Sequence, residues 1–278
     1  MIAESVYYSL GEALKSNKKE VFLNIKGILF PIYIDYKYES KWLLILPGAI
    51  DRNKKNIPIF QRSSYSGELN CNIICLFDPT LFFDKDISIG WFLGDTEYHY
   101  ADILGEFLKI NFDKMNVKMD NIYLYGSSAG GLPCLFLSSK LNGCRVMLYN
   151  IQTDILKYYR RFLIILYEKI FKKYQNFDIF VEKYKRRFYC SVLGDGEYYY
   201  IQNKSDEFHY KNFFLGFIDQ IKNTKNISYY IFNNPEIKHG PLNKDLEVKM
   251  LLSYVNNQLS LFLKEHEFKN YHKDVIPW

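Results

Sequence analysis

The sequence has no long apolar run and no mark of export at its start. No stretch of its 278 residues approaches the roughly 18 consecutive apolar residues that a membrane-spanning helix needs. The first residues, Met1 to Ser5, carry neither the basic start nor the apolar stretch of a secretory signal. We therefore expect no membrane span, no signal peptide and a cytoplasmic location.

Cysteine is scarce, and its number is odd. The chain has five cysteines, and the pair Cys71-x-x-x-Cys75 has no second pair with which to form a zinc site. Three of the five fall in apolar runs, where a thiol is usually a small buried hydrophobe. The sequence thus predicts reduced thiols, which fit an intracellular protein, no metal site and no permanently bound cofactor.

A strong excess of charge of one sign is also missing. The net charge is +5, and no nucleic-acid-binding motif gathers the basic residues, so we expect no nucleic-acid partner. Hydrophobic residues make up 48% of the chain and aromatic ones 18%, enough for a sizeable core. The length fits one large α/β domain or two small ones, and we predict one domain over 1–278.

Short apolar runs alternate with helical patterns along the chain. Strands are predicted over 21–25, 28–34, 42–46, 72–77, 122–125, 145–149, 188–193, 198–202 and 228–232, and helices near 97–112, from 132 onward, before 221 and over 246–264. The first two strands read as a hairpin. The remaining alternation, with short links, predicts an α/β fold with a mostly parallel, doubly wound sheet.

The most informative stretch is a nucleophile-elbow pattern, Gly126-x-Ser128-x-Gly130. It follows a short buried strand and precedes a helix, the context in which such a motif exposes a serine hydroxyl at a strained turn. The glycines let strand and helix pass close together. A glycine-rich turn that only packs the helix on the strand, or that binds a phosphate, is the alternative. Ser127 lies off the pattern, so Ser128 is the predicted nucleophile.

Two backbone segments are candidates for an oxyanion hole. The residue after the nucleophile, Ala129, supplies one N–H group in such enzymes, and a loop after an early strand supplies the second. Here Gly48 and Ala49 follow the predicted strand 42–46. A simple strand-ending turn explains these two residues equally well.

The general base and its acid are expected downstream, in the order serine, acid, histidine. His239 lies in a loop between the last predicted strand and the last helix, where the base belongs. Asp206 follows the strand 198–202 and is the favoured acid. Asp195 is the alternative, although its Asp-Gly context already explains it as a turn residue. His209, three residues after Asp206, is a possible supporting or substrate contact.

Residues 151–187 differ in character from the rest of the chain. The segment reads as helical and aromatic and holds ten Lys or Arg residues. It lies between two sheet strands, where a lid is commonly inserted, so we predict a helical, lid-like insertion. Its basic face would suit an anionic polymer, a nucleotide-bearing acyl donor or a lipid surface. Solvated helix charges are the alternative.

The segment Tyr123–Gly131, together with Asn203–His209 and His239, resembles the α/β-hydrolase-type O-acetyltransferases of bacterial capsule synthesis. A weaker similarity is to the acetyltransferase-like component of the accessory Sec system. In such proteins a Gly-Ser-Ser-x-Gly-Gly elbow and an acid three residues before a histidine carry the catalytic triad. The resemblance implies an α/β-hydrolase fold and a triad of Ser128, His239 and Asp206.

The function that the resemblance implies is O-acetylation of a bacterial surface carbohydrate with acetyl-CoA as donor. An esterase or carbohydrate deacetylase would use the same triad, with water in place of the sugar. A non-catalytic component of a glycan-assembly or secretion complex is a third possibility, and peripheral association with a membrane or such a complex fits it. The sequence gives neither the acyl group nor the oligomeric state.

Overall fold

A ten-stranded mixed sheet forms the centre of the molecule in the computed structural model, which describes residues 5–53, 56–172, 176–221 and 226–271. The strand order is β1-β2-β3-β5-β4-β6-β7-β8-β9-β10. The six strands from β5 to β9 in this order run parallel to one another. They are β5 (Asn72–Leu76), β4 (Trp42–Leu46), β6 (Ile122–Ser127), β7 (Arg145–Tyr149), β8 (Glu197–Asn203) and β9 (Ile227–Phe232).

Antiparallel pairs occur near both edges of the sheet. β2 (Glu20–Ile25) and β3 (Ile28–Asp35) form the predicted hairpin, and β3 then pairs with β5 in antiparallel fashion. The short β1 (Val6–Tyr7) lies parallel to β2 at one edge. At the other edge β10 (Lys269–Tyr271) pairs antiparallel with β9. The predicted mostly parallel, doubly wound sheet is therefore confirmed.

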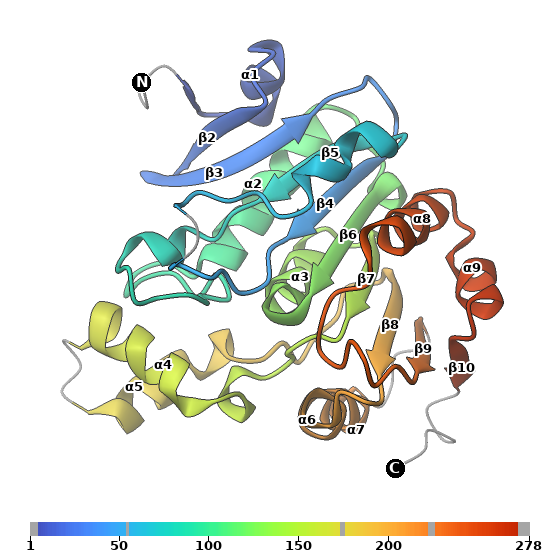
Figure 1. Ribbon diagram of the computed structural model, residues 1–278. Coiled ribbons are helices and arrows are strands. Elements are labelled where there is room, and N and C mark those ends of the chain that lie inside the picture. Colours follow the sequence, from blue (N-terminus) through green and yellow to red (C-terminus); the bar gives the residue numbers. More distant parts are fainter. Residues whose placement is uncertain (1–4, 54–55, 173–175, 222–225, 272–278) are drawn as a thin grey trace.

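Side chains of the central strands alternate between two apolar layers, one on each face of the sheet. In β4, Leu44 and Leu46 pack in the same layer as α2 and α3, whereas Leu43 and Ile45 pack with α8 and α9. All five residues of β4 are buried, as expected for a parallel strand covered on both faces. Figure 1 shows α8 and α9 on one side of the sheet and α2 and α3 on the other.

The helices follow the predicted alternation. They are α1 (Leu10–Lys15), α2 (Tyr100–Lys114), α3 (Gly131–Lys140), α4 (Arg160–Leu166), α5 (Phe177–Tyr184), α6 (Glu207–His209), α7 (Leu215–Gln220), α8 (Lys244–Val255) and α9 (Leu259–Glu265). Short 3-10 helices cover Ser63–Glu68, Pro79–Phe82, Met119–Asn121, Ser128–Gly130, Ile155–Lys157 and Lys185–Arg187, and π-helical turns cover Tyr167–Phe171 and Tyr210–Phe214.

Two predicted elements are wrong. Residues 188–193 form no strand, only an isolated bridge between Asp154 and Tyr189, because β8 already has β7 on one side and β9 on the other. The predicted helix over 246–264 is two helices. They separate at Asn257, whose φ of +60° is left-handed and whose side chain accepts a hydrogen bond from Tyr123 on β6.

The segment between β7 and β8 contains α4 and α5, which lie together at one end of the sheet (Figure 1). Some of its basic side chains are structural anchors. Arg187 donates to the carbonyl oxygens of Leu93, Asp95 and Tyr98, and Lys169 pairs with two aspartates. Arg160, Arg161 and Lys172 are exposed, and Lys173 lies outside the described residues. Whether the segment acts as a lid remains a prediction.

The thiols and the helix lengths agree with the composition. All five cysteines are free and buried, and burial raises the pKa of the Cys134 thiol well above its ordinary value. None of the helices in the described ranges is long and apolar enough to cross a membrane.

Candidate active site

Ser128 lies at a sharp turn between β6 and α3. Its φ of +51° is in the left-handed region that residues other than glycine rarely adopt. A Cβ atom on Gly126 would lie 2.5 Å from the carbonyl oxygen of Gly130, and a Cβ atom on Gly130 would lie 2.6 Å from that of Leu46. The strand and the helix thus pass so closely that only glycine fits two residues before and two residues after Ser128.

The structure brings Ser128, His239 and Asp206 together from the carboxyl ends of three strands. The Oγ atom of Ser128 is 2.9 Å from Nε2 of His239, and Nδ1 of His239 is 2.6 Å from Oδ2 of Asp206. Ser128 follows β6, Asp206 follows β8, and His239 lies in the loop after β9. Parallel strands end at one edge of a sheet, which explains how residues far apart in sequence meet here.

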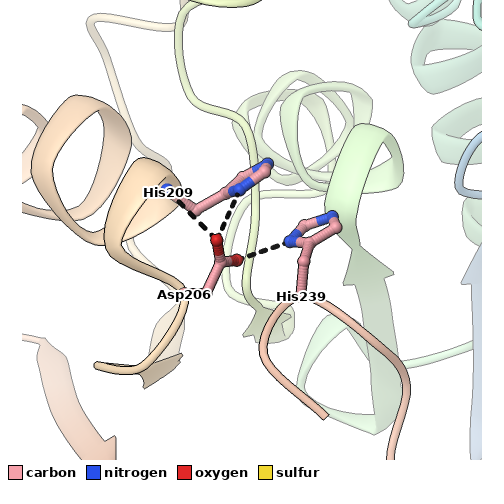
Figure 2. Close-up of side chains that lie close together, drawn as sticks. All are labelled: Asp206, His209 and His239. Atoms are coloured by element: carbon pink, nitrogen blue, oxygen red, sulfur yellow. Dashed lines mark hydrogen bonds and ion pairs between the residues drawn. The ribbon is translucent and has the colours of Figure 1, made fainter. Parts of the chain in front are cut away.

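Each oxygen of the Asp206 carboxylate faces the Nδ1 atom of a different imidazole ring (Figure 2). Its Oδ2 atom faces His239, and its Oδ1 atom is 3.1 Å from Nδ1 of His209. Burial by itself would raise the pKa of the Asp206 carboxyl, but hydrogen bonds from His209 and His239 outweigh burial and hold that pKa well below its usual range. Asp206 is therefore a carboxylate at neutral pH.

The predicted oxyanion donors near Ser128 differ in the partners of their N–H groups. Ala129 lies in the first turn of a 3-10 helix, where N–H groups have no partner within the helix. Gly48 is close to the serine, since a Cβ atom built on it would lie 3.7 Å from Cβ of Ser128. The Gly48 N–H, however, donates to Oε1 of Gln61 at 3.0 Å, and the Gln61 amide donates to the carbonyl oxygen of Ala49 at 3.1 Å. Gly48 would have to exchange Gln61 for a substrate oxygen.

A buried ion pair between Arg62 and Glu247 lies beside the turn that carries Ser128. Arg62 donates from Nε to Oε1 of Glu247 at 2.8 Å and from Nη2 to Oγ of Ser127 at 3.1 Å. The hydroxyl groups of Tyr65 and Tyr125 also donate to the Glu247 carboxylate. Burial works against the charged guanidinium, but Tyr125 and Glu247 raise the pKa of Arg62 above its ordinary value. Ser127 is thus bonded to Arg62, while Ser128 is bonded to His239.

Asp195, the alternative acid, lies away from this cluster. The Asp195 carboxylate accepts a hydrogen bond from Asn142 at 3.0 Å in an exposed turn, so the structure does not bring it to His239. His99 is buried against Asp102 and Phe136. Trp91 is buried, and its Nε1–H donates to Gln152 at 2.6 Å.

Within the described ranges, one group of residues has ligand atoms close enough together to hold a metal ion. It consists of Asp206, His209 and His239. Each carboxylate oxygen faces an imidazole Nδ1 at hydrogen-bond distance. An Nδ1–H that donates to the carboxylate has no lone pair left for an ion. The arrangement is that of a hydrogen-bonded acid with two histidines.

Three residues of the site had not been predicted. Gln152 lies three residues past the end of β7, and its backbone N–H donates to the carbonyl oxygen of Ser128 at 3.1 Å. A polar residue just past a buried parallel strand is a usable signal, since that edge carries the site. Arg62 and Glu247 offer no such signal, because they are far apart in sequence and meet only in the folded chain.

Comparison with known proteins identifies the fold. No protein-family model matches the sequence, and a search of curated proteins gives no match. A solved structure of the capsule O-acetyltransferase of Neisseria meningitidis serogroup A matches with a TM-score of 0.53 and 14% identity, over 87% of this chain and 93% of that chain. A carboxylesterase from Mesorhizobium loti matches with a TM-score of 0.51 and 9% identity, over 86% and 99% of the two chains.

A third match is to the glycosylation-associated protein complex Gap123 of Streptococcus agalactiae. The TM-score is 0.57 at 12% identity, over 86% of this chain and 45% of that chain. The chain has the α/β-hydrolase fold. Identities this low show a shared fold, and at that level the resemblance inferred from the sequence is confirmed. In α/β hydrolases the functional loops gather at the carboxyl edge of the sheet, the edge at which Ser128 lies here.

The Glu247→Gln substitution tests the ion pair behind the elbow. It removes the partner of a buried guanidinium, so the free energy of unfolding should fall by about 3–5 kcal/mol, measured by urea denaturation. Glu207→Gln is the matched control because Glu207 pairs with Lys211 at 2.9 Å on the surface, and it should leave the free energy of unfolding nearly unchanged, since exposed ion pairs contribute little. Equal losses in the two variants would contradict a special role for the Arg62–Glu247 pair.

Proposed function

We propose that this protein is a serine acyltransferase that O-acetylates a bacterial surface carbohydrate, with acetyl-CoA as the acyl donor. The observation that carries the proposal is the hydrogen-bonded series from Ser128 through His239 to Asp206, built on a serine in the left-handed conformation. Backbone strain of this kind persists where the surrounding structure enforces it, commonly at functional sites.

The proposed chemistry is acyl transfer in two steps. His239 Nε2 takes the proton of Ser128 Oγ while that oxygen attacks the thioester carbonyl carbon, and Asp206 stabilises the imidazolium that forms. The Ala129 N–H, with a second N–H from the Gly48–Ala49 loop, binds the oxyanion. The C–S bond then breaks, and the departing thiolate takes the proton from His239. In the second step His239 takes the proton of a sugar hydroxyl while that oxygen attacks the acyl carbon. The bond from the acyl carbon to Ser128 Oγ then breaks, and His239 returns the proton to Ser128 Oγ.

The choice of a carbohydrate acceptor rests on likeness of fold. The Neisseria protein is a capsule O-acetyltransferase, and this chain shares its fold over most of both lengths. The exposed side chains of Arg160, Arg161 and Lys172 lie in the segment that follows β7. Their positive charge suits the phosphates of coenzyme A or an anionic polymer.

An esterase or carbohydrate deacetylase is the second candidate. The Mesorhizobium carboxylesterase has the same fold, and the same three side chains would serve if water replaced the sugar hydroxyl. A non-catalytic role in a glycan-assembly complex has the Gap123 similarity in its favour. Such a role gives no reason for a strained serine hydrogen-bonded to a histidine.

The Ser128→Ala substitution should abolish acyl transfer with little change in the urea midpoint. Loss of a triad member typically costs several orders of magnitude in kcat. A fluorophosphonate probe should label wild-type protein at Ser128, located by peptide mass spectrometry. Ser127→Ala is the matched control and should keep the label. Labelling at Ser127, or activity retained in Ser128→Ala, would overturn the assignment.

The acid is tested by Asp206→Asn, with Asp195→Asn as its control. An asparagine at 206 removes the negative charge that stabilises the His239 imidazolium, so kcat should fall by about 10⁴-fold, as for the corresponding change in other triads. Asp195→Asn removes a surface turn carboxylate and should leave kcat near that of wild type. Steady-state hydrolysis of a small neutral ester is the assay. A larger loss for Asp195→Asn would reverse the choice of acid.

Transferase and hydrolase are separated by the acceptor. Release of free coenzyme A from acetyl-CoA is followed in water alone and with added oligosaccharides, and products are identified by mass spectrometry. A transferase should release coenzyme A faster with the right acceptor and give an acetylated sugar. An unchanged release rate with acetate as the sole product would favour the esterase. Ser128→Ala supplies the background rate.

A further inference from the structure

A second histidine is built into the site beside the proposed base. The His209 ring stacks on the His239 ring with centroids 3.7 Å apart and planes 14° apart. Its Nδ1 atom faces Asp206 at 3.1 Å, and its side chain is only 5% exposed. The His209 ring has no role in the acyl-transfer mechanism above, although it faces one of the two oxygens of the Asp206 carboxylate at hydrogen-bond distance.

The far side of the His209 ring is held by a glutamine whose orientation is fixed. Gln152 is fully buried, and its Oε1 atom accepts the Trp91 Nε1–H at 2.6 Å. Because an indole nitrogen can only donate, the Gln152 oxygen must face Trp91. The amide nitrogen then faces Nε2 of His209, at 3.5 Å.

This orientation decides where the His209 proton lies. An amide nitrogen only donates, so Nε2 of His209 must present its lone pair to Gln152. The single ring proton is then on Nδ1, where it points at Oδ1 of Asp206. His209 is thus a neutral ring that donates to the carboxylate through Nδ1–H.

We propose that His209 is a positioning residue that Trp91 and Gln152 hold as the neutral Nδ1–H tautomer, so that it fixes the Asp206 carboxylate and leaves His239 as the one ring that takes up a proton. This inference rests on the proposed function, since it concerns the same triad. The bond to Oδ1 keeps the carboxylate from rotating, and Oδ2 stays aimed at His239. A second cation stacked on His239 would weaken His239 as a base.

The surroundings of His209 oppose its protonation. Burial lowers the pKa of His209, and the nearby His239 lowers it further, against the opposing effect of Asp206. Besides Asp206 and His239, the titratable group facing the ring is Tyr158, at 6.1 Å between centroids. Burial raises the pKa of Tyr158, so it stays neutral in the range where a histidine titrates.

Two further tyrosines complete the titratable surroundings of the carboxylate. Tyr149 and Tyr200 interact electrostatically with Asp206, and burial raises the pKa of both tyrosines. Neither gains a charge near neutral pH. Among the described titratable groups near the site, this leaves the two imidazoles and Asp206 as the groups that can bind a proton.

The loop that carries Trp91 is itself strained and anchored. Trp91 and Phe92 have φ values of +50° and +53°, a left-handed conformation that residues other than glycine rarely adopt. The buried Asp78 carboxylate accepts the Phe92 N–H at 2.7 Å. The loop is thus held in a costly shape that aims the Trp91 indole at Gln152.

The first test is ¹⁵N NMR of histidine-labelled protein titrated from neutral to acidic pH. Nitrogen shifts distinguish a protonated from an unprotonated ring nitrogen. His209 should show a protonated Nδ1 and an unprotonated Nε2 at neutral and mildly acidic pH. The Gln152→Glu variant gives the His209 Nε2 atom an acceptor, so that atom should carry a proton at neutral pH. A wild-type His209 with a proton on Nε2 at neutral pH would overturn the proposal.

The second test is the pH–rate profile of His209→Phe, which keeps an aromatic ring but loses the donor to Asp206. We expect kcat to fall roughly 10- to 100-fold, the effect of losing a hydrogen bond to a charged group, with KM little changed. Without the bond to Oδ1 the carboxylate is free to turn away and stabilises the His239 imidazolium less, so the acid limb should move to lower pH. An unmoved acid limb would contradict a positioning role.

His99→Phe is the matched control because His99 is also buried and also bonded to an aspartate three residues away, at 2.9 Å. It should leave the acid limb in place. If His209→Phe does not fold, the NMR experiment still decides the tautomer. Failure of the proposed function would appear as activity retained in Ser128→Ala, whereas failure of this inference would appear in the nitrogen shifts, which need no turnover.

Discussion

The site is organised around one buried carboxylate, Asp206, whose two oxygens are each held by a different imidazole. A carboxylate is costly to bury unless hydrogen bonds compensate its charge. Here the compensating donors are His239 and His209, together with the backbone N–H of His209 at 3.4 Å. Because each ring depends on the carboxylate for its orientation, Ser128, His239 and Asp206 cannot be arranged independently.

The sequence predicted the parts of this arrangement that are local. The elbow requires glycine on both sides of Ser128, a steric demand that appears as a motif. Asp206 and His239 follow strands in parallel register, and the ends of such strands meet at one edge. His239 was predicted from its position in the loop between the last predicted strand and the last helix. Asp206 was favoured over Asp195 because an Asp-Gly turn already explained Asp195. The structure brings His239 and Asp206 together with Ser128, while their catalytic roles remain proposals.

The parts that the sequence did not reveal depend on tertiary contacts. Residues 188–193 are apolar enough to predict a strand, yet β8 has no free side on which they could pair. The break between α8 and α9 follows from Asn257, whose side chain bonds to β6. The Gly48 N–H looked available from its loop, but Gln61 reaches it from 13 positions away. No local pattern encodes such contacts.

The link between Arg62 and Glu247 also bears on how the molecule is made. Ser127 hydrogen-bonds to Arg62, and the charge of Arg62 is matched by a carboxylate on α8, near the end of the chain. During synthesis the elbow sequence leaves the ribosome long before α8 does. Until α8 docks, the Arg62 guanidinium beside the turn lacks its counter-ion. The packing around Ser127 and Ser128 is therefore complete only once α8 has joined the sheet.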